Sequence, residues 1–158
     1  VVIANYNSPG QSVISGERSA VEEVGKRLKE LGAKRVVPLA VSGAFHSALL
    51  KSASEGMNGV LEGVAIEPPK AVFVANVTGT ALEDPAEIRR RLVEQVVSPV
   101  RWVECVKALA NRRSSLFLEV GPGNVLRGLL RKIDPELKSM SAGRMSDIEK
   151  LLAAIATG

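Results

Sequence analysis

Cysteine and histidine are almost absent from this sequence: Cys105 and His46 are the only residues of their kinds among 158 residues. A single cysteine cannot form a disulfide within the chain. One cysteine and one histidine also cannot supply the three or four protein ligands that a zinc ion requires. We therefore expect neither a disulfide nor a zinc site.

Long apolar runs are lacking too. No stretch approaches the roughly 20 apolar residues of a membrane-spanning helix. Residues 1–5 are not a basic region followed by an apolar run and a cleavage site. We therefore expect no membrane association and a cytoplasmic location. The chain opens on a strand-like apolar run without an initiator methionine, so we expect it to be an internal piece of a longer protein.

Aromatic residues make up only 3% of the sequence, against 46% hydrophobic residues overall. The core must therefore consist mainly of Val, Leu, Ile and Ala, which favours an α/β protein with alternating strands and helices. The net charge is +4, with basic runs at residues 89–91 and 112–113. No aromatic side chains interleave with these runs, so we expect no nucleic-acid partner. Solvated helix faces explain the runs most simply, and docking of an acidic protein is the alternative.

The spacing of apolar and turn-forming residues predicts where strands and helices lie. The most regular pattern is a helix from residue 18, which Gly32 is placed to end. Another helix should begin with Asp84 as its N-cap and Pro85 in its first turn. The full expectation is a hairpin over 1–15, strands over 35–39, 71–75 and 116–120, and helices over 18–31, 47–61, 84–97, 99–109, 125–130 and 147–156.

Two segments are candidates for chemistry. His46 falls at the junction of a predicted strand and a predicted helix, where side chains often project into clefts. From residue type alone it is either a catalytic base or an ordinary surface or core histidine. Residues 121–123, Gly-Pro-Gly, precede a predicted helix as a phosphate-binding loop does. They lack the G-x-G-x-x-G and G-x-x-x-x-G-K-[ST] patterns, which favours a simple tight turn.

Four ordered blocks form the most specific pattern of the sequence: N-S-P-G-Q at 7–11, G-A-F-H-S at 43–47, Gln95 with S-P-V-R-W at 98–102, and E-V-G-P-G at 119–123. In type and order they resemble malonyl-CoA:acyl-carrier-protein transacylases and the related acyltransferase domains of polyketide synthases. The resemblance covers nearly the whole chain. It implies an α/β fold in which residues 1–41 are part of a small ferredoxin-like subdomain. Residues 42–158 would be the C-terminal portion of a hydrolase-like α/β subdomain.

The resemblance also implies roles for five residues. His46 matches the family's general base, and Gln95 matches the glutamine whose backbone carbonyl orients that base. Phe45 matches a bulky residue that crowds methylmalonyl and so favours malonyl, with a place in the core as the alternative. Asn7 and Asn76 resemble polar residues lining the family's cleft. The turn-forming habit of asparagine is an equal alternative for both.

The family's nucleophilic serine is missing from the sequence. That serine sits in a G-H-S-x-G turn, which residues 10–14 and 139–143 imitate only in part, and we expect both segments to be strands. The arginine that holds the malonyl carboxylate and the oxyanion-hole donors are missing as well. We therefore expect the chain to supply the histidine half of the site, to need an N-terminal half that carries the serine, and to be inactive alone.

The implied reaction is transfer of malonyl from malonyl-CoA, through a seryl ester, to the phosphopantetheine thiol of acyl carrier protein in fatty-acid biosynthesis. No metal or redox cofactor is implied. Two alternatives stay open: a piece of a polyketide synthase acyltransferase domain, or an inert fragment that only binds carrier protein or the missing half. Carrier protein is acidic by family expectation, so the basic runs at 89–91 and 112–113 are candidates for its docking.

Overall fold

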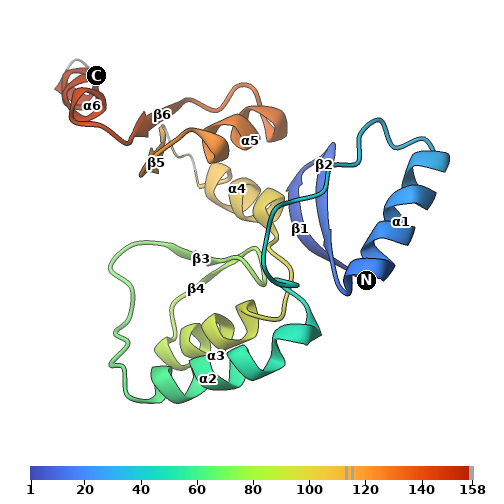
Figure 1. Ribbon diagram of the computed structural model, residues 1–158. Coiled ribbons are helices and arrows are strands. Elements are labelled where there is room, and N and C mark those ends of the chain that lie inside the picture. Colours follow the sequence, from blue (N-terminus) through green and yellow to red (C-terminus); the bar gives the residue numbers. More distant parts are fainter. Residues whose placement is uncertain (113, 115, 157–158) are drawn as a thin grey trace.

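The computed structural model describes residues 1–112, 114 and 116–156, which form a mixed α/β chain (Figure 1). Within these residues the strands pair as β1 with β2, β3 with β4, and β5 with β6. The strands are β1 Val2–Ser8, β2 Gln11–Ser15, β3 Phe73–Ala75, β4 Thr80–Leu82, β5 Phe117–Val120 and β6 Ser139–Ala142. The helices are α1 Arg18–Glu30, η1 Ala48–Leu50 (a short 3-10 helix), α2 Lys51–Glu62, α3 Pro85–Gln95, α4 Trp102–Ala110, α5 Val125–Ile133 and α6 Met145–Ala156.

The first thirty residues confirm the predicted hairpin and helix. β1 and β2 are antiparallel and turn at residues 9–10. α1 ends where Gly32 adopts a φ of 93°, a left-handed conformation that glycine enters without steric penalty. Residues 35–39 are not a strand, so that prediction was wrong. Pro38 has no N–H for a strand ladder, no strand in the described residues pairs with this segment, and Val36 packs beside Gly25 of α1 instead.

The middle of the chain holds two helices and a small hairpin. The predicted helix over 47–61 exists as η1 followed by α2, and Asp84 caps α3 through its carboxylate as expected. The buried strand predicted over 71–75 is shorter than expected, covers only β3, and leaves Val72 48% exposed. β3 turns back at once through Gly79 into β4, a strand of three residues that is too short for its sequence pattern to stand out.

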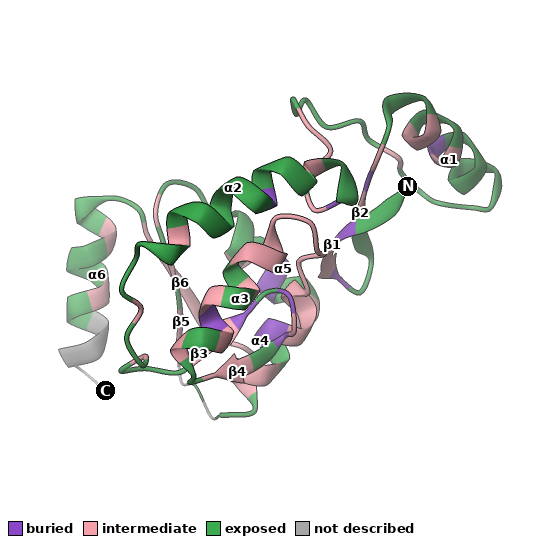
Figure 2. Ribbon diagram, turned by 90° about the horizontal axis from the view of Figure 1, so that it is seen from below, coloured by how far each residue is buried: buried purple, intermediate pink, exposed green. Residues whose placement is uncertain are grey.

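α4 lies at the centre of the described chain. It contacts β1, β3, β4 and α5, and its Cys105 and Val106 are only 3% and 2% exposed. Val100, two residues before this helix, joins it to the N-terminal hairpin, because Val100 N–H donates to Ala4 O at 2.8 Å and Tyr6 N–H donates to Val100 O at 2.9 Å. Buried positions lie on α4, α5 and β1 (Figure 2), three elements that contact one another.

The C-terminal part is a strand-helix-strand unit. β5 and β6 are parallel, and α5 connects them. Residues 139–142 and 11–15 are strands as predicted, so neither imitation of the nucleophile turn is a turn of that kind. On β5, side chains alternate in burial: Leu118 is 43% and Val120 81% exposed, whereas Phe117 and Glu119 are half-buried. One face of β5 is therefore uncovered by the described residues.

Candidate active site

His46 has an unusual backbone. It is the one non-glycine residue with positive φ, 58°, in the described part of the chain. Ser47, which is 4% exposed, brackets this conformation with its hydroxyl. The hydroxyl donates to Ala44 O at 2.6 Å and accepts from Leu49 N at 3.3 Å, which makes Ser47 the N-cap of η1. The strained turn is therefore held by hydrogen bonds on both sides of the histidine.

The imidazole of His46 lies against the end of α3. Its Nδ1 is 3.0 Å from the backbone carbonyl oxygen of Gln95, 49 residues along the chain. This carbonyl is free to accept because the last turn of α3 tightens: Val96 N donates to Val93 O and Val97 N to Glu94 O, both three residues back. The histidine thus satisfies a helix-end carbonyl that no helical N–H reaches.

The Gln95 side chain folds back over the same turn. Its Nε2 donates to Ser98 O at 3.1 Å and also lies 3.3 Å from His46 Nδ1. A carbonyl oxygen can only accept, so the shorter contact, with Gln95 O, is a hydrogen bond in the tautomer that carries the ring proton on Nδ1. In this tautomer Nε2 of His46 is the basic nitrogen, and it has no hydrogen-bond partner among the described residues. An unprotonated Nε2 held this way is the arrangement of a general base.

The other predicted site residues, Phe45, Asn76 and Asn7, differ in exposure and in the elements that carry them. Phe45 is adjacent to His46 and 49% exposed, so it is a surface residue of this chain rather than a core residue. Asn76 is exposed, and its side-chain oxygen lies 3.6 Å from Cys105 Sγ. Asn7 is half-buried at an irregularity in β1, between the paired residues Tyr6 and Ser8.

The link between α3 and α4, residues 96–101, joins the elements that carry these residues. Gln95 binds Ser98 O, and Val100 pairs with the strand that holds Asn7. Arg101 N–H donates to Asn76 O at 2.8 Å. The guanidinium of Arg101 lies 5.9 Å from the centre of the Tyr6 ring, within the range of a cation–π contact. Asn76 and the strand that holds Asn7 are therefore joined to the same linker as Gln95, although neither asparagine is hydrogen-bonded to His46 in the described part of the chain.

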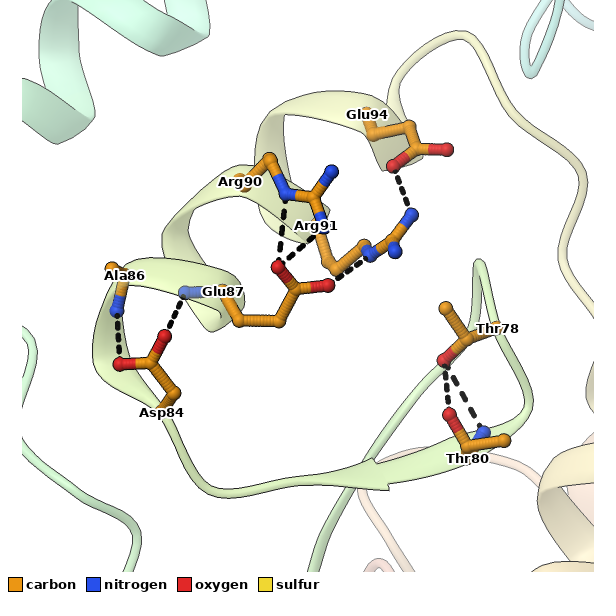
Figure 3. A network of polar contacts seen from close by, with 8 residues as sticks. All are labelled: Thr78, Thr80, Asp84, Ala86, Glu87, Arg90, Arg91 and Glu94. Carbon is orange, nitrogen blue, oxygen red and sulfur yellow. Dashed lines mark hydrogen bonds and ion pairs between the residues drawn. The ribbon is translucent and has the colours of Figure 1, made fainter.

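Two arginines of α3, Arg90 and Arg91, form ion pairs within the helix (Figure 3). Glu87 accepts from both Arg90 and Arg91, and Arg91 also donates to Glu94 at 2.6 Å. The hydrogen bonds that Glu87 accepts from Arg90 and then Arg91 lower the pKa of Glu87, and those that Arg91 donates to Glu87 and Glu94 raise the pKa of Arg91. These charges are partly neutralised before any partner arrives. In the second basic run, Arg112 is exposed, and Arg113 lies outside the described residues.

The backbone amides that follow the Gly-Pro-Gly segment already have a hydrogen-bond acceptor within the chain. Gly121 and Gly123 both have positive φ, 127° and 95°, as a tight turn requires. The Glu119 carboxylate accepts from Leu126 N at 3.0 Å and Arg127 N at 2.9 Å, the amides that a phosphate would need at the start of α5. In the described ranges no group of three or more His, Cys, Asp or Glu residues is arranged to hold a metal ion. No helix described is long and apolar enough to cross a membrane.

The sequence did not single out two serines that contact this site. Ser47 forms the turn around His46, and Ser54 of α2 donates to Val93 O near the end of α3 at 3.0 Å. Ser47 carries the usual N-cap signal, a serine at the start of a helical pattern. Ser54 carries no local signal, because a serine inside a helix usually faces solvent.

Comparison with known proteins identifies the family. The family model described as an acyl transferase domain matches residues 1–148. The chain belongs to this acyl transferase family. It is 41% identical over 157 residues to the malonyl CoA-acyl carrier protein transacylase of Bacillus subtilis, a match that covers 99% of this chain and 49% of that protein. It is 45% identical over 141 residues to the Haemophilus influenzae protein of the same name, covering 89% of this chain and 45% of the relative.

Solved structures of acyl transferases agree with this assignment. An acyl-carrier-protein S-malonyltransferase from Burkholderia pseudomallei superposes with a TM-score of 0.92 at 41% identity, covering 96% of this chain and 49% of that one. A malonyl-transacylase in complex with a type II polyketide acyl carrier protein superposes with a TM-score of 0.90 at 41% identity, again over 96% and 49%. The chain therefore spans about half the length of the relatives it matches, and the resemblance to malonyl-CoA:acyl-carrier-protein transacylases is confirmed.

Proposed function

We propose that this chain supplies the histidine half of a malonyl-CoA:acyl-carrier-protein transacylase. The observation that carries the proposal is the 3.0 Å contact between His46 Nδ1 and Gln95 O, which suits the Nδ1–H tautomer and leaves Nε2 without a hydrogen-bond partner in the described chain. The matching relatives are named as transacylases that use malonyl-CoA and acyl carrier protein. A neutral histidine with one fixed nitrogen and one free nitrogen is suited to the proton transfers of such a reaction.

The reaction has two stages, and each stage needs two proton transfers at Nε2 of His46. A serine from the N-terminal half attacks the malonyl thioester, and its hydroxyl proton moves to Nε2 of His46. The C–S bond then breaks, and the coenzyme A thiolate takes that proton as it leaves. In the second stage of the reaction, the phosphopantetheine thiol gives its proton to Nε2 while its sulfur attacks the seryl ester. The C–O bond breaks and serine recovers the proton, so His46 ends neutral.

Phe45 is the candidate for selecting malonyl. It adjoins His46, and its half-exposed ring is available to border a bound acyl group. A bulky ring at this place would crowd the α-methyl group of methylmalonyl and leave malonyl unaffected. Discrimination of one methyl group by a pocket is worth about 1–3 kcal/mol, so we expect preference rather than exclusion.

The uncovered face of β5 supports the need for another half. Parallel strands are normally covered on both faces, yet Leu118 and Val120 are 43% and 81% exposed. The relatives are about twice as long as this chain, which leaves room for a further layer. We propose that the serine-bearing half packs on this face and that the chain alone does not transfer malonyl.

The test is intact-protein mass spectrometry after incubation with malonyl-CoA. Three samples are compared: the 158-residue chain, a chimera that places the first half of the Bacillus subtilis relative before this chain, and the chimera with His46→Ala. We expect malonylation of the chimera only, with transfer to added acyl carrier protein. A malonylated 158-residue chain would show that it holds a nucleophile of its own and would overturn the proposal. Transfer at an unchanged rate by the His46→Ala chimera would remove His46 from the mechanism.

A further inference from the structure

α2 and α3 lie side by side as an antiparallel pair (Figure 1), and three hydrogen bonds join α3 to α2 and to the segments that flank α2. At one end His46 contacts Gln95 O; in the middle Ser54 Oγ donates to Val93 O at 3.0 Å. At the far end Arg89 donates to Val64 O at 2.6 Å. From one contact to the next, residue numbers rise on the α2 side (46, 54, 64) and fall on the α3 side (95, 93, 89). The three contacts therefore fix the register of the two antiparallel helices.

Ser54 is an unusual residue at the centre of this pairing. It is the only buried residue of α2, at 9% exposure, while apolar residues on the same helix such as Val60 are 66% exposed. The helix is therefore attached by a hydroxyl where an aliphatic side chain would be ordinary. The acceptor, Val93 O, lies two residues before Gln95, in the tightened last turn that presents the Gln95 carbonyl.

We propose that Ser54 is a positioning residue for His46. By holding the last turn of α3 against α2, its hydroxyl keeps Gln95 O within 3.0 Å of Nδ1 and so keeps the imidazole in the tautomer with a basic Nε2. Gln95 Nε2 lies 3.3 Å from the same nitrogen and is a competing donor. A small shift of the turn favours that amide over the carbonyl and moves the ring proton to Nε2. The catalytic meaning rests on the proposed function, whereas the effect on the tautomer does not.

The chain offers a direct readout because His46 is its only histidine. Nitrogen-detected NMR of the 15N-labelled 158-residue chain at alkaline pH reports one imidazole and its tautomer without assignment. Ser54→Ala removes the hydroxyl. Ser52→Ala makes the same change at an exposed position of the same helix and serves as the matched control. Ser54→Thr keeps the hydroxyl and tests rescue.

We expect the Nδ1–H tautomer in the unmodified chain, in Ser52→Ala and in Ser54→Thr. In Ser54→Ala the ratio of the two tautomers should fall by about twofold to tenfold, the range set by the net worth of one hydrogen bond. An unchanged ratio in a folded Ser54→Ala chain overturns the proposal. If Ser54→Ala loses its helical circular dichroism, Ser54→Cys, which keeps the volume but donates weakly, takes its place under the same criterion.

Failure of this proposal and failure of the proposed function are separable. If the chimera with the Bacillus subtilis half does not transfer malonyl, the tautomer ratio still reports whether Ser54 positions the ring. If the chimera is active but Ser54→Ala leaves the tautomer unchanged, only the role of Ser54 is lost. In an active chimera we expect Ser54→Ala to lower kcat and leave KM unchanged, since Ser54 has no contact with a substrate site.

Discussion

The turn at His46 places backbone strain on the residue that we propose as the general base. A non-glycine residue with φ of 58° costs of order 1–3 kcal/mol, and it persists only where neighbouring contacts hold it. The Ser47 hydroxyl provides two such contacts, to Ala44 O and from Leu49 N. The direction of the imidazole is therefore set partly by backbone strain and partly by its bond to Gln95.

Removing the Ser47 hydroxyl should disturb His46 beyond the loss of a helix cap. We expect Ser47→Ala to lower the free energy of unfolding by about 0.5–2 kcal/mol, as loss of an N-cap does, and to shift the His46 imidazole NMR signals. Asp84→Ala is the matched control, because it removes the side-chain cap of α3 and has no contact with the histidine turn. Urea denaturation measures both variants. Equal shifts of the imidazole signals in both would contradict a specific role for Ser47.

Cys105 is a buried thiol that should resist alkylation. Burial, and then the charge of Glu104, raise the pKa of the Cys105 thiol to about 11 from a usual 9.0. Deprotonation therefore moves to higher pH, and at pH 8 the reactive thiolate is about a hundredfold scarcer than for an ordinary cysteine. Ser52→Cys adds an exposed thiol as an internal standard. With iodoacetamide at pH 8, mass spectrometry should show one label quickly and the second only after unfolding in urea. Two fast labels would show that Cys105 is accessible.

At the scale of elements, the helices were more predictable than the strands. Asp84 with Pro85 and the glycine after α1 are local signals, and the structure confirms them. The wrong strand at 35–39 and the missed β4 both depend on pairing, which no local pattern encodes. A β-branched pair such as Val36 and Val37 becomes part of a strand only if a partner strand lies beside it.

The candidate site was predictable for a different reason. The resemblance named both His46 and Gln95, and their contact joins positions 49 residues apart that no periodicity connects. Ser54 was not predictable, because its role depends on the register of α2 against α3. The ion pairs of Glu87 with Arg90 and Arg91 join positions three and four residues apart in one helix, a spacing that can be read from the sequence.

The β3–β4 turn and α4 approach each other so closely that only glycine fits between them. A Cβ at Gly79, where φ is 67°, would lie 2.4 Å from the Cβ of Glu104. We expect Gly79→Ala to lower the free energy of unfolding by at least about 2 kcal/mol, from left-handed strain and overpacking together. Gly56→Ala, in an open part of α2, should raise it by about 0.5–1 kcal/mol. Urea denaturation should show changes in the free energy of unfolding of opposite sign for the two variants. An unchanged free energy of unfolding in Gly79→Ala would contradict the close contact between the β3–β4 turn and α4.

On the scale of the whole molecule, the two basic runs are not equivalent as docking sites for acyl carrier protein, the partner that we propose. Arg90 is ion-paired with Glu87, whereas Arg112 is exposed and has no salt bridge among the described residues. In the chimera we expect Arg112→Glu to raise the KM for carrier protein more than Arg90→Glu does. The difference should shrink in high salt, because salt screens exposed charges. Steady-state kinetics at two salt concentrations measure this, and an unchanged KM in Arg112→Glu would exclude docking at that run.

The exposed face of β5 is where we propose that the serine-bearing half packs, and a substitution on this face tests that proposal. If the serine-bearing half packs there, a charge at Val120, now 81% exposed, would have to be buried on assembly. Val120→Lys should therefore leave the circular dichroism of the isolated chain unchanged but abolish malonyl transfer when the serine-bearing half is added as a separate chain. Val120→Thr keeps the branched shape and strand preference, and it should retain most of the activity. Equal activity of the Lys and Thr variants would show that the partner half does not cover this face, and that the open strand requires another explanation.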